Sequence, residues 1–254
     1  REEADAVLVQ SYAQAVLTHP KEQLEVDRLL RLSIRTRPHA PAGYFLLSAH
    51  RWEHQRFTES VELHRVACCL DDREEQFAEA YVRVARATGQ LPDAVRLLQH
   101  RVRRADVPAP AAVRSLYYGL LDRGEPDFAW TALDKAIEKL SSREPEASAS
   151  NPDALASGSR LQGESASKAA DLRLFKAELL ANHGRFDEAE AELEAAKAAA
   201  PPVTWLRAAA KVARTRPDFH AALRYLKELL DRDPLNAEAE RLYAGLLQDA
   251  EGRE

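Results

Sequence analysis

The chain of 254 residues has little of what sheets, disulfide-bonded domains and membrane proteins require. It contains 9 glycines, 2 cysteines, 7% aromatic residues and no methionine, and β-branched residues are scarce beside alanine, leucine, arginine and glutamate. Strands therefore have little to build on, and the composition predicts an all-α fold without a sheet. No apolar run approaches the length that spans a bilayer, so we expect no membrane partner.

Charge and cysteine content bear on the binding partners of the protein and on its location in the cell. The net charge is −5 and the pI is near 6.0, which argues against a protein that coats nucleic acid. Cys68 and Cys69 are adjacent, and neighbouring side chains diverge on a helix, so we expect packing residues and no disulfide. With no signal-like segment at Arg1, we expect a cytoplasmic protein.

Residues 171–202 contain the clearest structural pattern, two short amphipathic helices hinged at Gly184. The predicted first helix carries apolar residues at Leu172, Phe175 and Leu179, and the second carries Ala189 and Leu193 on one face. Neither helix can bury its apolar stripe alone, so such a pair is expected to stack on copies of itself.

A period of this kind runs along the chain. Units that begin at Val7, Pro41 and Glu75 follow one another at a spacing of 34 residues. A fourth unit begins at Pro110, one residue late, because an insertion falls in the connection around Pro108. Further units cover 171–202 and 203–236, and a single helix is expected over 237–250. The last residues, EGRE, resemble the turn that would lead onward, so we expect a chain cut inside a further repeat.

This spacing resembles the tetratricopeptide repeat family, whose unit is a helix-turn-helix of 34 residues. Gly89, Gly124 and Gly184 match the turn glycine, and Pro38 and Pro201 are among the matches to the terminal proline. The small residue at which the two helices touch is matched by Ser60, Ala94, Ala129, Ala189 and Ala222. The resemblance implies a right-handed α-solenoid of tetratricopeptide-type helix-turn-helix repeats.

Three residues depart from the family pattern. Val26 takes the small contact position of the first unit, Arg101 replaces a small residue in the third, and Lys21 replaces the first turn glycine. The departures put the packing of those units in question and leave the repeats themselves in place.

The predicted organisation has three parts. Residues 1–140 form an N-terminal stack of four repeats, and residues 170–254 form two repeats with a terminal or truncated helix. Between them, residues 141–169 are rich in serine and alanine and lose the apolar periodicity. Such a segment buries too little surface to offset its ordering entropy, so we expect a flexible insertion, with room for one short helix over 151–161.

The family resemblance implies that the first helices line a concave groove. Projection of those helices onto the groove predicts a ligand-binding set in which basic residues outnumber acidic ones: Phe45, Trp52, Arg83, Arg86, Arg114, Tyr118, Arg207, Lys211, Arg214 and Arg241. Arginine forks suit carboxylates and aromatic walls suit apolar side chains, so an acidic peptide or protein with an apolar anchor is expected. The alternative is that these arginines are solvated or paired with neighbouring glutamates.

Catalytic and metal-binding motifs are weak. His50 and His54 have the i,i+4 spacing of a metal pair, and His64 is expected in the partner helix, but the sequence places no further thiolate or carboxylate ligand. The run of carboxylates from Asp187 to Glu194 has the spacing of a solvated helix face. We therefore expect no metal, no cofactor and no enzymatic activity.

Three functions remain open. The first is a non-catalytic scaffold that binds a protein or peptide in the groove. The second is the repeat arm of a larger enzyme, for example a glycosyltransferase or sulfotransferase, whose catalytic domain lies outside this chain. The third, binding of single-stranded RNA, is disfavoured by the acidic balance and by a repeat of 34 residues where 35 would be usual.

Overall fold

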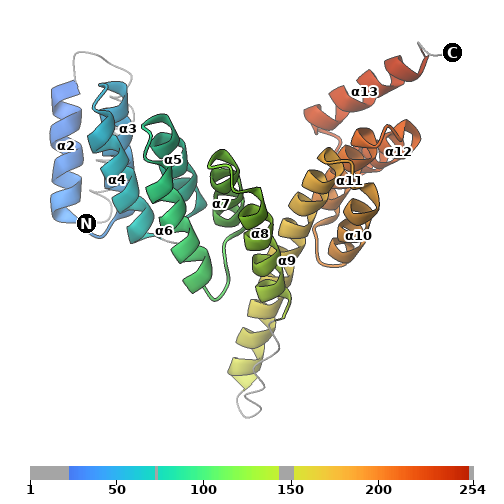
Figure 1. Ribbon diagram of the computed structural model, residues 1–254, viewed down its shortest axis with the longest axis horizontal. Coiled ribbons are helices and arrows are strands. Elements are labelled where there is room, and N and C mark those ends of the chain that lie inside the picture. The colour runs from blue at the N-terminus through green and yellow to red at the C-terminus, as the bar shows by residue number, and fades with distance from the viewer. Residues whose placement is uncertain (1–22, 72–73, 143–151, 252–254) are drawn as a thin grey trace. The chain divides into compact units, whose positions relative to one another are not determined.

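The computed structural model describes residues 23–71, 74–142 and 152–251. Those residues form α-helices and no strand, so the predicted all-α class of helical repeats is confirmed (Figure 1). The chain divides into two compact units, Arg1–Ala132 and Leu133–Glu254. The division falls inside a helix, eight residues before the expected boundary at residue 140. No described helix is long and apolar enough to cross a membrane.

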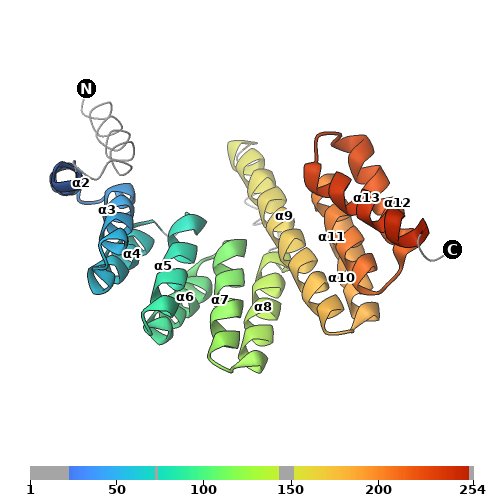
Figure 2. The same cartoon turned by 90° about the horizontal axis from the view of Figure 1, so that it is seen from above.

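Unit 1 is a row of antiparallel helices (Figure 2). They are α2 (Gln23–Thr36), α3 (Pro41–Glu53), α4 (Phe57–Leu70), α5 (Glu75–Ala87), α6 (Leu91–Arg104), α7 (Pro110–Asp122) and the first turns of α8 (Pro126–Ser141). Proline stands at the start of α3 and α7, where its missing N–H would have no partner in any case. The start of the predicted first unit at Val7 and the departure at Lys21 lie outside the described residues.

Unit 2 contains the rest of α8 followed by five helices. These are α9 (Pro152–Asn182), α10 (Phe186–Lys197), α11 (Pro202–Thr215), α12 (Phe219–Arg232) and α13 (Ala237–Glu251). Leu206, Leu226 and Leu246 belong to one buried cluster that joins α11, α12 and α13. Leu247 of α13 is 37% exposed.

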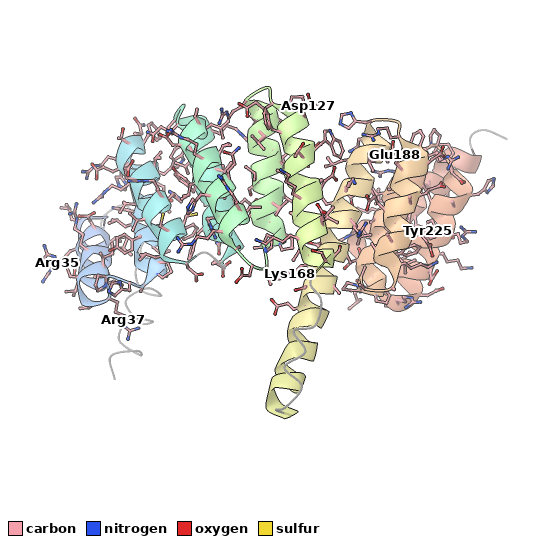
Figure 3. All side chains as sticks on the ribbon, turned by 60° about the horizontal axis from the view of Figure 1, so that its bottom comes forward. Arg35, Arg37, Asp127, Lys168, Glu188 and Tyr225 are labelled. Atoms are coloured by element: carbon pink, nitrogen blue, oxygen red, sulfur yellow. The ribbon has the colours of Figure 1, made fainter. Side chains whose placement is uncertain are left out.

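The predicted insertion is partly helical. α9 begins at Pro152 and runs for 31 residues, so it includes 152–169, and its N-terminal half extends past the ends of α10 and α11 (Figure 3). The stretch lacks an apolar stripe but is rich in alanine and other helix-forming residues. It continues from a helix that packing already stabilises, and adding turns to an existing helix avoids the cost of nucleation. Residues 143–151 lie outside the described part of the chain.

The residues at the predicted contact positions are fully buried. Ser60, Ala94, Ala129, Ala189 and Ala222 are all 0% exposed. A small side chain lets the two helices of a pair approach closely, so each larger neighbour fills the space beside it. Val26 is 1% exposed, so a larger residue is buried equally well at this position in the first pair.

The predicted turn glycines adopt a backbone conformation that other residues avoid. Gly89, Gly124 and Gly184 have φ angles of 74°, 75° and 74°. A Cβ added at any of the three would meet nothing within 4 Å. Glycine is therefore needed at these turns for its backbone freedom and not for lack of space.

Gly184→Ala and Gly245→Ala form a matched pair in unit 2. We expect Gly184→Ala to destabilise the protein by about 1 kcal/mol, because alanine is strained at positive φ. Gly245 lies inside α13, and a Cβ there also meets nothing within 4 Å, so Gly245→Ala should stabilise by about 0.5–1 kcal/mol. Urea midpoints measured by circular dichroism test both. Equal shifts would show that the conformation at Gly184 is not the constraint.

Candidate functional site

The first helices of unit 1 lie next to one another and present a common surface. Phe45 of α3 contacts Phe77 of α5 with ring centroids 5.1 Å apart. Arg86 of α5 forms an ion pair with Asp122 of α7. These contacts place α3 beside α5 and α5 beside α7.

The aromatic residues of this surface differ in how much they are available to a ligand. Phe45 is half-buried, and its ring also meets the His64 ring edge-on at 5.6 Å, so much of it packs against the protein. Trp52 is half-buried against Phe57 with centroids 4.7 Å apart. Tyr118 is 45% exposed and is the most accessible of the predicted aromatic residues.

The predicted cations of unit 1 differ in their exposure and in their ion pairs. Arg83 is exposed and makes no ion pair within the described part of the chain. Arg86 pairs with Asp122, as the alternative interpretation of paired arginines expects. Arg114 is half-buried. Arg83 is therefore the cation of this surface that a carboxylate could reach without displacing an internal partner.

In unit 2 the predicted cations gather on α11. Arg207, Lys211 and Arg214 are exposed and lie at i, i+4 and i+7, which places them on one face of the helix. Lys211 pairs with Glu178 of the neighbouring α9. Arg207 and Arg214 make no ion pair with any described residue. We call these three residues the α11 cation column.

Arg241 completes the predicted set. It is exposed on α13, and its Nε donates a hydrogen bond to the backbone oxygen of Ala237 at 3.1 Å. No ion pair to Arg241 is found among the described residues, so its guanidinium keeps donors for another group.

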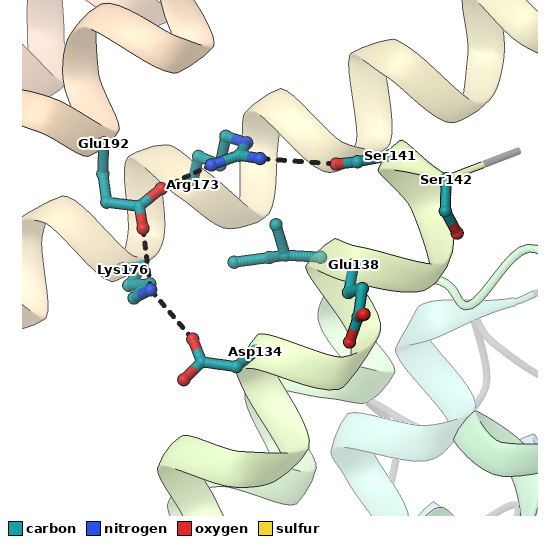
Figure 4. A pocket seen from close by; sticks show the side chains of 8 residues that line it. Asp134, Glu138, Ser141, Ser142, Arg173, Lys176 and Glu192 are labelled. Atoms are coloured by element: carbon teal, nitrogen blue, oxygen red, sulfur yellow. Dashed lines mark hydrogen bonds and ion pairs between the residues drawn. The ribbon is translucent and has the colours of Figure 1, made fainter.

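A second polar network in unit 2 was not predicted. Lys176 of α9 lies between two carboxylates, 2.8 Å from Asp134 of α8 and 2.7 Å from Glu192 of α10 (Figure 4). Arg173 donates to Glu192 at 2.9 Å and to the Ser141 hydroxyl at 3.4 Å. These residues line an open cavity of about 470 Å³. Only the three-dimensional packing of α8, α9 and α10 brings them together, so periodicity could not reveal the network.

The network holds Lys176 in its charged form. Burial alone would lower the pKa of Lys176, but hydrogen bonds to Asp134 and Glu192 outweigh it and raise the pKa. The side chain of Glu192 is only 15% exposed and receives both cations. The network therefore links three helices, and its charges are paired with one another, although the side chain of Asp134 is 54% exposed.

The histidines suggested as a metal pair take part in packing. The ring of His50 lies against that of His54 with centroids 4.3 Å apart. His64 is 5% exposed; its Nδ1 donates to the Ser60 carbonyl at 2.9 Å, and its Nε2 lies 3.1 Å from the Ser48 hydroxyl. Among the described residues, no group of three or more His, Cys, Asp or Glu is placed to hold a metal ion.

Burial lowers the pKa of His64; the hydrogen bond to Ser60 opposes this shift, and the charge of Arg83 adds to it. An unfolded histidine titrates near 6.5. As pH falls below that value, the unfolded chain therefore binds a proton before the folded chain does, and stability is lost.

We expect His64→Gln to lower the free energy of unfolding by about 1 kcal/mol at pH 7.5, because a buried hydrogen bond is lost. Between pH 7.5 and pH 5, the variant should lose less stability than the wild type, because it lacks the group that is protonated on unfolding. Urea midpoints at the two pH values provide the test. The exposed His220→Gln is the control. A variant that loses as much stability on acidification as the wild type would contradict the assignment.

We compared the chain with protein families, curated proteins and solved structures. No protein-family model matches the chain, and no curated protein matches it. Several solved structures are similar to it. A structure of PilF from Pseudomonas aeruginosa has 14% identity and a TM-score of 0.44, covering 96% of this chain and 98% of its own. TTC0263, a tetratricopeptide repeat protein of Thermus thermophilus, has 18% identity and a TM-score of 0.49, covering 82% and 100%.

A third similar structure is that of YrrB, a tetratricopeptide repeat protein with an unusual peptide-binding site. It has 15% identity and a TM-score of 0.41, and the match covers 84% of this chain and 96% of YrrB. The evidence for the fold of the present chain comes from its own helix pairs, turn glycines and buried contact residues. By those features the chain has a tetratricopeptide-type repeat fold.

Proposed function

We propose that the chain is a non-catalytic scaffold that binds an acidic segment of a partner protein on its first-helix surfaces. The observation that carries the proposal is the α11 cation column. Three cations share one helix face, and only Lys211 has a carboxylate partner among the described residues. The acidic composition of the chain as a whole makes this local excess of positive charge more notable.

The column does not help the fold. Like charges four residues apart on a helix destabilise it by about 0.2–0.5 kcal/mol per pair. Glu178 offsets part of that repulsion by pairing with Lys211, and it leaves Arg207 and Arg214 with donors directed to solvent. A bound carboxylate would offset the repulsion between these cations, and this would add to the free energy of binding.

The spacing of the column suits an extended peptide. Arg207 and Arg214 are seven residues apart, which on an α-helix is about 10 Å along the axis. A polyproline II chain rises about 3.1 Å per residue with three residues per turn, so acidic residues three apart lie on one side of the peptide and span about the same distance. Each arginine can offer its planar fork to one carboxylate.

Unit 1 supports a preference for an apolar residue beside the acid. Arg83 is the ninth residue of α5 and Tyr118 is the ninth residue of α7, so they hold equivalent positions on neighbouring first helices. A cation next to a partly exposed aromatic ring favours a peptide in which a carboxylate is close to an apolar side chain.

The test uses fluorescein-labelled extended peptides with two glutamates three residues apart and one phenylalanine, alongside peptides with glutamine in place of glutamate. Binding is followed by fluorescence polarisation at low and at physiological salt. We expect the acidic peptides to bind more tightly, and their affinity to fall with salt. The double variant Arg207→Gln with Arg214→Gln should weaken binding about tenfold.

The matched control is Arg224→Gln with Lys227→Gln, which removes the same charge from α12 in the same unit. It should leave affinity within about twofold, since these residues lie on a second helix. The column variant should unfold at the same urea midpoint as the wild type or a higher one, because it relieves like-charge repulsion. Equal losses in the two double variants, or equal binding of the glutamine peptides, would reject the proposal.

A further inference from the structure

A second cavity in unit 2 lies beside the polar network and has a different character. It encloses about 360 Å³ between the end of α8, the part of α9 that was expected to be an insertion, and the end of α10. Its apolar lining consists of Leu140 and five alanines from α9, α10 and the turn that follows α10. The volume is at the small end of the range for ligand pockets, about 300–1,000 Å³.

The polar groups of this cavity are hydrogen-bond donors. Its polar lining residues are Ser141, Ser165 and Arg173, and no Asp or Glu within the described part of the chain lines it. Arg173 is the only charged residue among the described residues that line it. The cavity therefore combines an apolar wall with one cation and two hydroxyls.

Ser165 is the observation that points to a ligand. Ser165 is 2% exposed, and its buried hydroxyl oxygen has no hydrogen-bond partner among the residues that the structure describes. Buried polar groups in proteins are almost always paired, so an unpaired hydroxyl that lines a cavity indicates a missing partner. The bond from Arg173 to Ser141 is long, at 3.4 Å, so that arm of the guanidinium can turn to a better acceptor.

We propose that this cavity binds a small aliphatic carboxylate. The carboxylate accepts hydrogen bonds from Arg173, Ser141 and Ser165, and the hydrocarbon body lies against Leu140 and the alanines. Arg173 keeps its other arm on Glu192, which fixes the guanidinium at the cavity wall. The partial negative charge at the C-terminal end of α8 opposes an anion here, so binding depends on Arg173. The site shares no residue with the α11 cation column, and it stands or fails independently of the peptide proposal.

The probe is hexanoate, titrated into the full chain and followed by backbone amide shifts in NMR spectra, with hexanol and hexylammonium as neutral and cationic comparisons. We expect saturable binding of hexanoate with a Kd of about 1 mM, as suits a ligand of this size. Shifts should gather on the ends of α8 and α10 and on the part of α9 around Ser165. Hexanol and hexylammonium should bind at least tenfold more weakly.

Two variants distinguish binding in the cavity from a general effect of the neighbouring polar network. Arg173→Gln should weaken hexanoate binding at least tenfold. Lys176→Gln removes the neighbouring cation of the same network, which does not line this cavity, and should change affinity by less than about twofold. Circular dichroism confirms that each variant is folded.

Ser165 supplies a test that does not depend on charge. Ser165→Ala should weaken binding about threefold and raise the thermal midpoint of the free protein, because it removes an unpaired buried hydroxyl. Ser165→Val fills part of the cavity and should abolish binding with helix content unchanged. The proposal is overturned by an absence of saturable shifts with hexanoate, by equal binding of hexanol, by equal losses in Arg173→Gln and Lys176→Gln, or by a lowered midpoint in Ser165→Ala.

Discussion

The fold depends on one constraint, which is that a pair of short amphipathic helices has apolar surface on both sides and can bury it only against another pair. The small contact residues make this possible, because Ala94, Ala129 and Ala189 let paired helices approach until no solvent reaches them. The turn glycines then fix the angle at which each pair closes. A residue on a first helix therefore has neighbours from the adjacent repeats as well as from its own pair, and those neighbours decide whether its charge is satisfied.

Features that recur with the repeat could be predicted from the sequence, since each copy supports the others. Composition and spacing predict the class of fold, and resemblance to the tetratricopeptide repeat unit identifies the contact residues and the turn glycines. The helix over 152–169 could not be found in this way, because that part of α9 has no apolar stripe and depends on continuity with the packed part of the same helix. The pairing of Arg86 with Asp122 and of Lys211 with Glu178 could not be predicted, because it depends on the distances between neighbouring helices.

Charge serves two purposes in unit 2. In the network around Glu192, two cations and two carboxylates from three helices are held within hydrogen-bond distance and are partly removed from solvent. Breaking one member of such a network leaves another charge poorly solvated, so the network resists exchange with an outside ligand. On α11 the cations are exposed and mostly unsatisfied, so a partner can bind there without first breaking an internal bond.

This difference explains why the two proposed sites select different ligands. The α11 column is open, and exposed ion pairs contribute little each, so affinity there must come from several carboxylates on one chain. The cavity at Ser165 is small and presents a single cation beside an apolar wall. One carboxylate meets its polar groups, and further charge on the ligand would be buried without a partner, at a cost that grows with burial. Arg173 lies where the network meets the cavity, and its hold on Glu192 keeps one arm in place while the other remains available to a ligand.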